Sequence, residues 1–371
     1  VRPPRPRGRI PSMFTPYATP HEGAPVIREG GVSVRAAPAN LRPGDEDLFA
    51  HEREREIPPT RLLELRGVSA TPEGLLFKGA SILPESFSSP VMMGRFLGRR
   101  RGVLKFFATN LLRRRRRRIE EPCLWVTDDW SNGYFHWLAD ALPRLYAARD
   151  AARDLVLLLP HGYERLGFVT SSLKLFDVRR VEYVGADEVC VCERLLMPTH
   201  TAPSGHYNEP LVRELRDFLL EGCGAARGGA AAGGARLYVS RGRAPKRKLS
   251  NESEVARAVE EFGFRVVYFE EHPFEEQVRL TAGAEYLVSN HGAGLTNVLF
   301  MPEGASVLEL RREGERERNW FFNLASAARV RYYYQTCAPA GGDAHSGDLL
   351  ADVGALRDNL ALMLGAEKSG G

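Results

Sequence analysis

A histidine and an aspartate lie one helical turn apart in the segment 130–145, WSNGYFHWLADALPRL. The i, i+4 spacing puts Asn132, His136, Asp140 and Arg144 on one polar stripe, opposite an apolar stripe. His136 falls in the first turns of this helix, where the helix dipole disfavours imidazolium, and Asp140 is placed to orient the neutral ring. A neutral, oriented imidazole is a general base. A His–Asp pair that only satisfies itself at a surface is the alternative interpretation.

The proline of this segment limits how far the stripe extends. Pro143 cannot donate a backbone hydrogen bond, so we expect the helix to kink or end near Leu142. Asn132 and Arg144 are expected on the acceptor side of a site, and the position of Arg144 is the less fixed of the two.

Basic residues gather in a second segment, 238–252, YVSRGRAPKRKLSNE, after a predicted strand and before a helix over 252–262. Guanidinium groups at the carboxyl end of a strand suit a diphosphate. Arg241, nearest the strand, is the strongest candidate, and Arg247 is a second one. A solvated basic loop is the alternative, and helix capping alone explains Asn251.

A glycine-rich turn follows a third predicted strand in 285–310, EYLVSNHGAGLTNVLFMPEGASVLEL. We expect the turn His291, Gly292, Ala293, Gly294 to bring backbone N–H groups and a helix N-terminus close to an anion. Tight packing of the turn is the alternative. Glu309 is expected either to bond a ribose hydroxyl or to cap the sheet edge.

The elements around these segments alternate between strands and helices, which predicts an α/β fold with parallel sheets. The boundaries that we expect are a loose N-terminal arm over 1–60, an α/β domain over 61–222, a Gly/Ala linker over 223–235, a Rossmann-like domain over 236–345, and a C-terminal helix and tail over 346–371. Two such domains place a cleft between the carboxyl ends of their strands, where ligands of open α/β folds bind.

Composition narrows the class of protein. A chain of 371 residues with 43% hydrophobic and 26% charged residues is neither disordered nor a polytopic membrane protein. Five cysteines without a CxxC pair indicate neither a disulfide framework nor a zinc site, and no stretch has the pattern of a signal peptide. These features predict a cytoplasmic protein.

Positive charge is concentrated in one place. Ten Arg and Lys residues between 99 and 118 leave the rest of the chain at 4 − 10 = −6 from the net charge of +4. The segment 91–118 mixes this charge with apolar residues in an interrupted helical pattern, so an anionic membrane surface is one possible partner. A solvated loop is the bland alternative, and sparse aromatic residues argue against nucleic acid.

Taken in order, the three segments resemble glycosyltransferase family 61. Asn132 to Arg144 resembles its N-terminal signature, Tyr238 to Arg241 with Arg247, Asn251 and Glu252 its central one, and His291 to Asn297 with Phe300 and Pro302 its third. The likeness covers about residues 120 to 335, and nothing in the first 118 residues takes part in it.

The resemblance implies a GT-B type fold with two Rossmann-like domains facing across a cleft. It also implies inverting transfer from a nucleotide sugar, with UDP expected, to a glycan or glycolipid hydroxyl without an essential metal or other cofactor. Bacterial members of the family point to capsular or surface polysaccharide at the inner face of a membrane. Donor-binding residues would then be Arg241, Arg247, Asn251, His291, Gly292, Ala293, Gly294, Asn297 and Glu309. A catalytically silent glycan-binding relative and another nucleotide-sugar enzyme, such as an epimerase, stay open.

Overall fold

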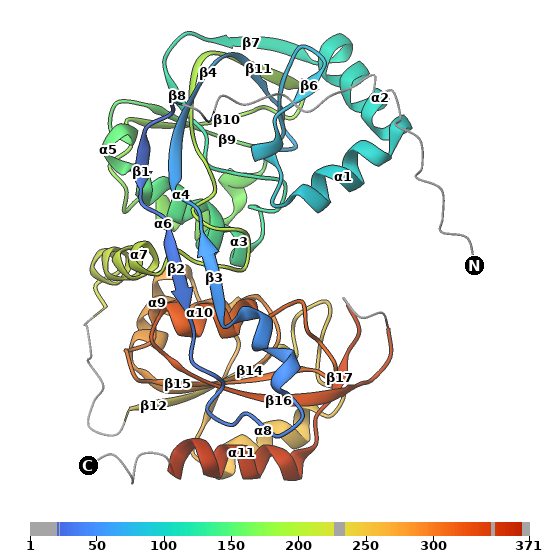
Figure 1. The fold of residues 1–371 in the computed structure, drawn as a ribbon, viewed down its shortest axis with the longest axis vertical. Coiled ribbons are helices and arrows are strands. Elements are labelled where there is room, and N and C mark those ends of the chain that lie inside the picture. Colours follow the sequence, from blue (N-terminus) through green and yellow to red (C-terminus); the bar gives the residue numbers. More distant parts are fainter. Residues whose placement is uncertain (1–20, 22, 226–233, 343–345, 366–371) are drawn as a thin grey trace.

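The computed structural model describes residue 21 and residues 23–225, 234–342 and 346–365. Its main strands form two sheets that lie in two bodies, at the top and bottom of Figure 1. Most of the Gly/Ala linker expected at 223–235 lies outside the described residues, as do the first 20 residues and the end of the C-terminal tail.

The sheet of the first body is mixed. Its strand order is β10-β9-β8-β11-β4-β5-β6, with β1 beside β4 and β7 beside β11. The strands are β1 (Val26–Arg28), β4 (Thr60–Ala70), β5 (Leu76–Lys78), β6 (Ser81–Ile82), β7 (Arg115–Ile119), β8 (Cys123–Leu124), β9 (Val156–Leu159), β10 (Arg180–Tyr183) and β11 (Glu188–Pro198). The pairs from β10 to β11 are parallel, whereas β11, β4, β5 and β6 pair antiparallel. The prediction of a parallel sheet is therefore wrong for half of this body, because the turn from β4 to β5 is too short for a parallel crossover.

The helices of this body are α1 (Pro90–Gly98), α2 (Arg100–Ala108), α3 (Tyr134–His136), α4 (Leu142–Ala147), α5 (Arg149–Ala152), α6 (Gly167–Leu173) and α7 (Glu209–Gly222). Helix α7 lies where the two bodies meet (Figure 1), and Asn208 caps it by accepting a 3.3 Å hydrogen bond from the Leu211 amide. Within the described residues, no helix is both long and apolar enough to span a bilayer.

The sheet of the second body has the order β13-β12-β14-β15-β16-β17, and only β17 is antiparallel to its neighbour. The strands are β12 (Ala235–Val239), β13 (Arg265–Val267), β14 (Ala284–Asn290), β15 (Ser306–Arg312), β16 (Arg331–Pro339) and β17 (Leu349–Leu350). Counted from β12, the parallel strands follow the doubly wound order 2-1-3-4-5, in which ligands bind at the carboxyl ends of the two strands where the order reverses. Those two strands are β12 and β14.

Helices cover both faces of the second sheet. Helices α8 (Glu252–Glu261) and α11 (Val353–Gly365) pack on the outer face, whereas α9 (Phe274–Ala282) and α10 (Trp320–Ala327) lie between the sheet and the first body (Figure 1). One apolar cluster joins the bodies, since Leu124 and Trp137 of the first share it with Leu299 and Phe321 of the second. The two sheets therefore share part of one core.

Residues 26–60, expected to be a loose arm, connect the two bodies instead. After β1 the chain enters β2 (Gly31–Val34), reaches the second body and returns through β3 (Glu54–Ile57), which pairs with β2. At the far end, the Ala39 amide donates to the Tyr332 carbonyl at 2.8 Å, and the buried Phe49 ring packs on Phe322 and Tyr334.

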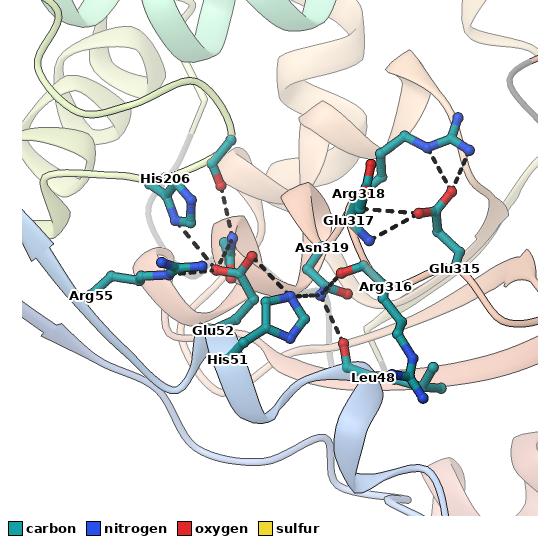
Figure 2. A network of polar contacts seen from close by, with 12 residues as sticks. Leu48, His51, Glu52, Arg55, His206, Glu315, Arg316, Glu317, Arg318 and Asn319 are labelled. Atoms are coloured by element: carbon teal, nitrogen blue, oxygen red, sulfur yellow. Dashed lines mark hydrogen bonds and ion pairs between the residues drawn. The ribbon is translucent and has the colours of Figure 1, made fainter. Parts of the chain in front are cut away.

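Figure 2 shows how this connecting segment is anchored. Asn319, at the start of α10, donates to the Leu48 carbonyl at 2.9 Å. Glu52 lies 3.4 Å from His206 of the first body and accepts a 3.4 Å hydrogen bond from Arg55. The segment is thus bonded to both bodies beside the place where they meet.

Candidate active site

A cavity of about 340 Å³ lies between the bodies and gathers all three predicted segments. This volume is within the range of ligand pockets. The first body contributes Trp130, Asn132, Gly133, Tyr134, Phe135 and His136. The second contributes Lys246 and Arg247 from the loop after β12, His291, Gly292 and Ala293 from the turn after β14, and Trp320 and Phe321 of α10.

The helix that carries His136 is interrupted by a π-helical turn. Helix α3 is followed by the π turn Trp137–Ala141 and then by α4, with Pro143 in its first turn. The irregularity predicted near Leu142 is therefore a widened turn just before the proline, a feature that is frequent at functional sites. His136 and Asp140 stay in contact across this π turn, with His136 Nδ1 and Asp140 Oδ2 2.7 Å apart.

The His136–Asp140 pair has one member on the cavity wall. The side chain of His136 is 13% exposed and that of Asp140 only 4%, and Asp140 also accepts a 3.0 Å hydrogen bond from Ser204. An ionised carboxylate only accepts, so the geometry suits an Nδ1–H that donates to Asp140, and in the neutral imidazole Nε2 then keeps its lone pair. His136 is thus placed to contact a ligand, and Asp140 to hold the ring.

The outer members of the polar stripe behave differently. Asn132 is exposed at the cavity rim. Arg144, expected on the acceptor side, lies in the interior with 0% exposure and donates two hydrogen bonds to the Pro198 carbonyl, at 3.0 and 2.7 Å. Its pKa is lowered to about 10 by burial, which outweighs the effect of Asp128 and other carboxylates. The extra residue of the π turn rotates Arg144 away from the stripe.

The adjacent carboxylates Asp128 and Asp129 bind different partners. Asp128 Oδ2 lies 3.1 Å from His200 Nε2, whereas Asp129 accepts a 2.7 Å hydrogen bond from the Ser88 amide. In the part of the chain that the structure describes, no three His, Cys, Asp or Glu side chains are grouped so as to hold a metal ion. The metal independence predicted from the sequence stays a prediction.

Arg241, the strongest candidate for a diphosphate ligand, holds the backbone of the loop that follows β12. It is buried and donates to the carbonyls of Lys246 at 3.1 Å and Arg247 at 3.4 Å. Its pKa is lowered by burial. Gly292 makes room for it, because a Cβ at this position would lie 2.1 Å from its Nη1. Arg241 therefore positions the backbone of Lys246 and Arg247, and these two residues line the cavity.

Arg247 is a strained and unpaired cation. Its backbone is left-handed, with φ of 57°, and its carbonyl accepts a 2.6 Å hydrogen bond from Asn290. Within the described residues its buried Nε has no hydrogen-bond partner, and its guanidinium forms no ion pair with a carboxylate. Burial, reinforced by Arg241, lowers its pKa to about 10. An unpaired charge with these surroundings favours an anionic ligand.

His291 is held by a buried carboxylate. Its Nδ1 lies 2.5 Å from Glu309, whose other oxygen accepts from the Tyr332 hydroxyl, and its ring packs between Trp320 and Phe321. Its Nε2 is buried with no hydrogen-bond partner among the described residues. Burial lowers the pKa of His291 and outweighs the effect of Glu309. Glu309 is 0% exposed and both of its oxygens bond protein groups, so here it positions His291, and its bond to a ribose stays a prediction.

Three other predicted donor-binding residues contact protein groups in this structure, and their role toward a donor stays a prediction. Asn251 does not cap α8 with its side chain, and instead bonds the backbone of Ala351 at 2.8 and 3.2 Å. Asn297 joins the bodies, since it accepts a 2.8 Å hydrogen bond from Tyr134 and donates to the Gly294 carbonyl. Gly294 lets the turn pack on β12, because a Cβ there would lie 3.1 Å from Val239.

Sequence reasoning missed the aromatic wall of the cavity. The Trp320 ring stacks on Phe135, with ring centroids 5.1 Å apart and planes at 18°. The run RNWFF at 318–322 gave little signal, since aromatic residues at the start of a helix are ordinary core residues. A small cavity of about 20 Å³ behind His291 was also missed, and it is lined by Arg247, Arg311, Arg312, Arg318 and Glu315.

Comparison with known proteins gives a match over the same segments. A family model described as glycosyltransferase 61 matches residues 134–308, which contain His136, Asp140, Arg247 and His291. The match covers slightly less than half of the chain, and it ends one residue before Glu309.

Individual relatives are animal glycosyltransferases. The EGF domain-specific O-linked N-acetylglucosamine transferase of Bos taurus is 28% identical over 238 residues, 58% of this chain and 45% of that protein. Its Rattus norvegicus counterpart is 30% identical with the same coverage. The protein O-linked-mannose beta-1,4-N-acetylglucosaminyltransferase 2 of Bos taurus is 37% identical over 102 residues, 27% of this chain and 17% of that protein. The matches span less than half the length of these relatives, so this chain resembles one part of known glycosyltransferases.

Proposed function

We propose that this protein is a glycosyltransferase of family 61 that moves a sugar from a nucleoside-diphosphate sugar to a hydroxyl group. The observation that carries the proposal is the cavity itself, in which the His136–Asp140 pair faces the unpaired cation Arg247 and the His291 turn. The family model matches both walls. Transfer needs a base for the acceptor and positive charge for the leaving diphosphate, and these lie on opposite walls.

His136 acts as the base in this proposal. The acceptor hydroxyl gives its proton to Nε2 while its oxygen attacks the anomeric carbon. The bond from that carbon to the diphosphate oxygen breaks, and the electron pair leaves with the nucleoside diphosphate. Asp140 stabilises the imidazolium that forms, through the 2.7 Å contact. A single displacement with the base opposite the leaving group inverts the anomeric carbon.

The second body neutralises the leaving group. Lys246 and Arg247 lie on the wall beside Gly292, at the carboxyl ends of β12 and β14. His291 presents Nε2, which becomes a donor once the diphosphate draws a proton onto the ring. Fixed cations at the site of developing charge take the role that Mg²⁺ plays elsewhere, so we propose transfer without a metal.

The two bodies support a GT-B type arrangement as part of this proposal. The strand order of the second sheet is that of a nucleotide-binding α/β fold, and its reversal point faces the first body. The first sheet departs from a Rossmann-like order because β4 to β6 pair antiparallel.

UDP-N-acetylglucosamine is the first donor to test, because the names of the relatives carry N-acetylglucosamine. Those names also point to two acceptors, an EGF domain and a protein-linked mannose. A glycan hydroxyl of a surface polysaccharide is the acceptor that we predicted from the sequence, and it belongs in the same panel.

The decisive assay measures UDP released by the full chain from a panel of UDP-sugars, with each acceptor class and with or without EDTA. We expect release from one donor that EDTA does not reduce, that His136→Ala abolishes and that the control His161→Ala leaves unchanged. Thermal stabilisation by UDP without release from any donor would instead indicate a catalytically silent relative. Stabilisation by NAD and not by UDP would point to an epimerase or a similar enzyme.

A further inference from the structure

The arginine run at 113–118 is mostly neutralised by the fold. The sequence pattern placed it in an interrupted helix, but Arg115–Ile119 form strand β7, which pairs in parallel with β11. Four of the six arginines are paired with carboxylates: Arg114 with Glu73, Arg115 and Arg117 with Glu188, and Arg118 with Glu193. This run therefore offers little free charge.

Among the described residues of this part of the chain, most of the positive charge without ion-pair partners lies before β7, on α1, α2 and the π-helical turn Thr109–Arg113. Residues 90–113 contain no Asp or Glu, and their cations form no ion pair with any residue that the structure describes: Arg95, Arg99, Arg100, Arg101, Lys105 and Arg113. Figure 1 shows both helices at the outer edge of the first body, away from α7 and the second sheet.

The same helices expose apolar side chains. Leu104, Leu111 and Leu112 are 50%, 38% and 82% exposed, and Val91 of α1 is 62% exposed. Leu104 and Leu111 lie two helical turns apart on the outer face of α2 and its π-helical extension Thr109–Arg113. The neighbouring stripe of α2 is fixed to the core: Val103 and Phe107 are buried, and Phe107 packs on Phe77.

We propose that the α1–α2 surface, residues 91–113, binds an anionic lipid bilayer. Its arginines would contact lipid phosphates while Leu104, Leu111 and Leu112 enter the boundary between headgroups and acyl chains, as in interfacial amphipathic helices. The charge of the surface opposes pairing with a second copy of itself. Single-stranded nucleic acid fits less well, because the aromatic rings that would stack on bases, such as Phe107, face inward.

The test is co-sedimentation of the full chain with vesicles of phosphatidylcholine alone and of phosphatidylcholine with about one-third phosphatidylglycerol. We expect binding to the anionic vesicles only, weakened by raised salt. The double variants Leu111→Ser with Leu112→Ser, and Arg100→Gln with Arg101→Gln, should each lower the partition coefficient at least about tenfold.

Matched controls lie on the opposite end of the molecule. Leu362→Ser on α11, where the leucine is 52% exposed, and Arg257→Gln on the exposed side of α8 should leave vesicle binding unchanged. Binding that the α2 variants do not weaken, or that the controls weaken equally, refutes the proposal. Binding to a single-stranded oligonucleotide but not to vesicles, or a lipid-free dimer that the leucine variant dissociates, refutes it in favour of those partners. None of these readouts depends on sugar transfer.

Discussion

Replacing Arg247 with methionine should stabilise the free protein and at the same time remove its affinity for the diphosphate. Methionine keeps an unbranched apolar stem like that of arginine and removes the buried charge. Among the described residues, the Arg247 guanidinium forms no hydrogen bond or ion pair that this change would break. The backbone contacts of residue 247 do not depend on its side chain.

The size of the effect follows from the low pKa. A pKa of about 10 in place of 12.5 means that burial disfavours the charged form in the folded protein. The difference corresponds to about 3 kcal/mol, which we reduce to about 1 to 2 kcal/mol because solvent reaches part of the side chain. Since neutral pH is below both pKa values, the folded protein carries this cost in full. We therefore expect Arg247→Met to raise Tm by about 2 to 4 °C.

The same variant should lose about 2 to 4 kcal/mol of interaction with the diphosphate, or roughly 10² to 10³ in Kd. UDP at about one hundred times the wild-type Kd stabilises the wild type by ~2.7 kcal/mol and should hardly shift the melting of the variant. Thermal melts with and without UDP measure both effects, with Arg257→Met as the control on an exposed helix face. A variant that melts lower than wild type, or that UDP still stabilises in full, would refute the assignment of Arg247.

Three further predictions concern the opposite wall, the buried histidine and the connecting segment. Asp140→Asn and His136→Ala should each lower kcat by about 10² to 10⁴ and leave UDP affinity unchanged in calorimetry; full turnover in both would exclude this pair as the base. Burial lowers the pKa of His291 and favours the neutral ring in the free protein, so UDP binding should take up a proton and weaken as the pH rises above that lowered pKa. Calorimetry in two buffers of different ionisation enthalpy measures that uptake, and equal heats in both, or unchanged uptake in His291→Asn, would contradict it. Phe49→Ala should lower the free energy of unfolding by about 3 to 5 kcal/mol, and both bodies should still melt in one transition at a lower Tm. Two separate melting steps would argue against a shared core.

Local patterns predicted the second body well. The helix predicted at 252–262 and the final amphipathic helix correspond to α8 and α11. Both could be predicted because the spacing of their apolar residues indicates which face is buried. The convergence of the segments 130–145, 238–252 and 285–310 on one cavity was also expected, although Arg247 lines it in place of Arg241. The carboxyl ends of β12 and β14 must meet at one edge of the sheet, which brings the second and third segments together.

The sequence predictions fail where contacts with residues far away in the sequence, or an irregular helical turn, determine the local structure. Arginine has no strand preference of its own, and β7 forms because β11 and Glu188 lie beside it. Arg144 left its predicted stripe through a π turn that period-3.6 reasoning does not contain. The contacts of Glu309 with His291 and Tyr332 were likewise not predicted, because they are set by the tertiary fold.

The double passage of residues 26–60 between the bodies has a consequence for biosynthesis. Asn40 bonds Tyr334 and Asn359, which are synthesised 294 and 319 residues after it, and Phe49 packs on Tyr334. The connecting segment therefore cannot complete its contacts until Tyr334 and Asn359 have been synthesised. A fragment expressed from residue 236 onward would lack Phe49 and expose the surfaces of Phe322 and Tyr334 that pack against it, so we expect the second body alone to be less stable.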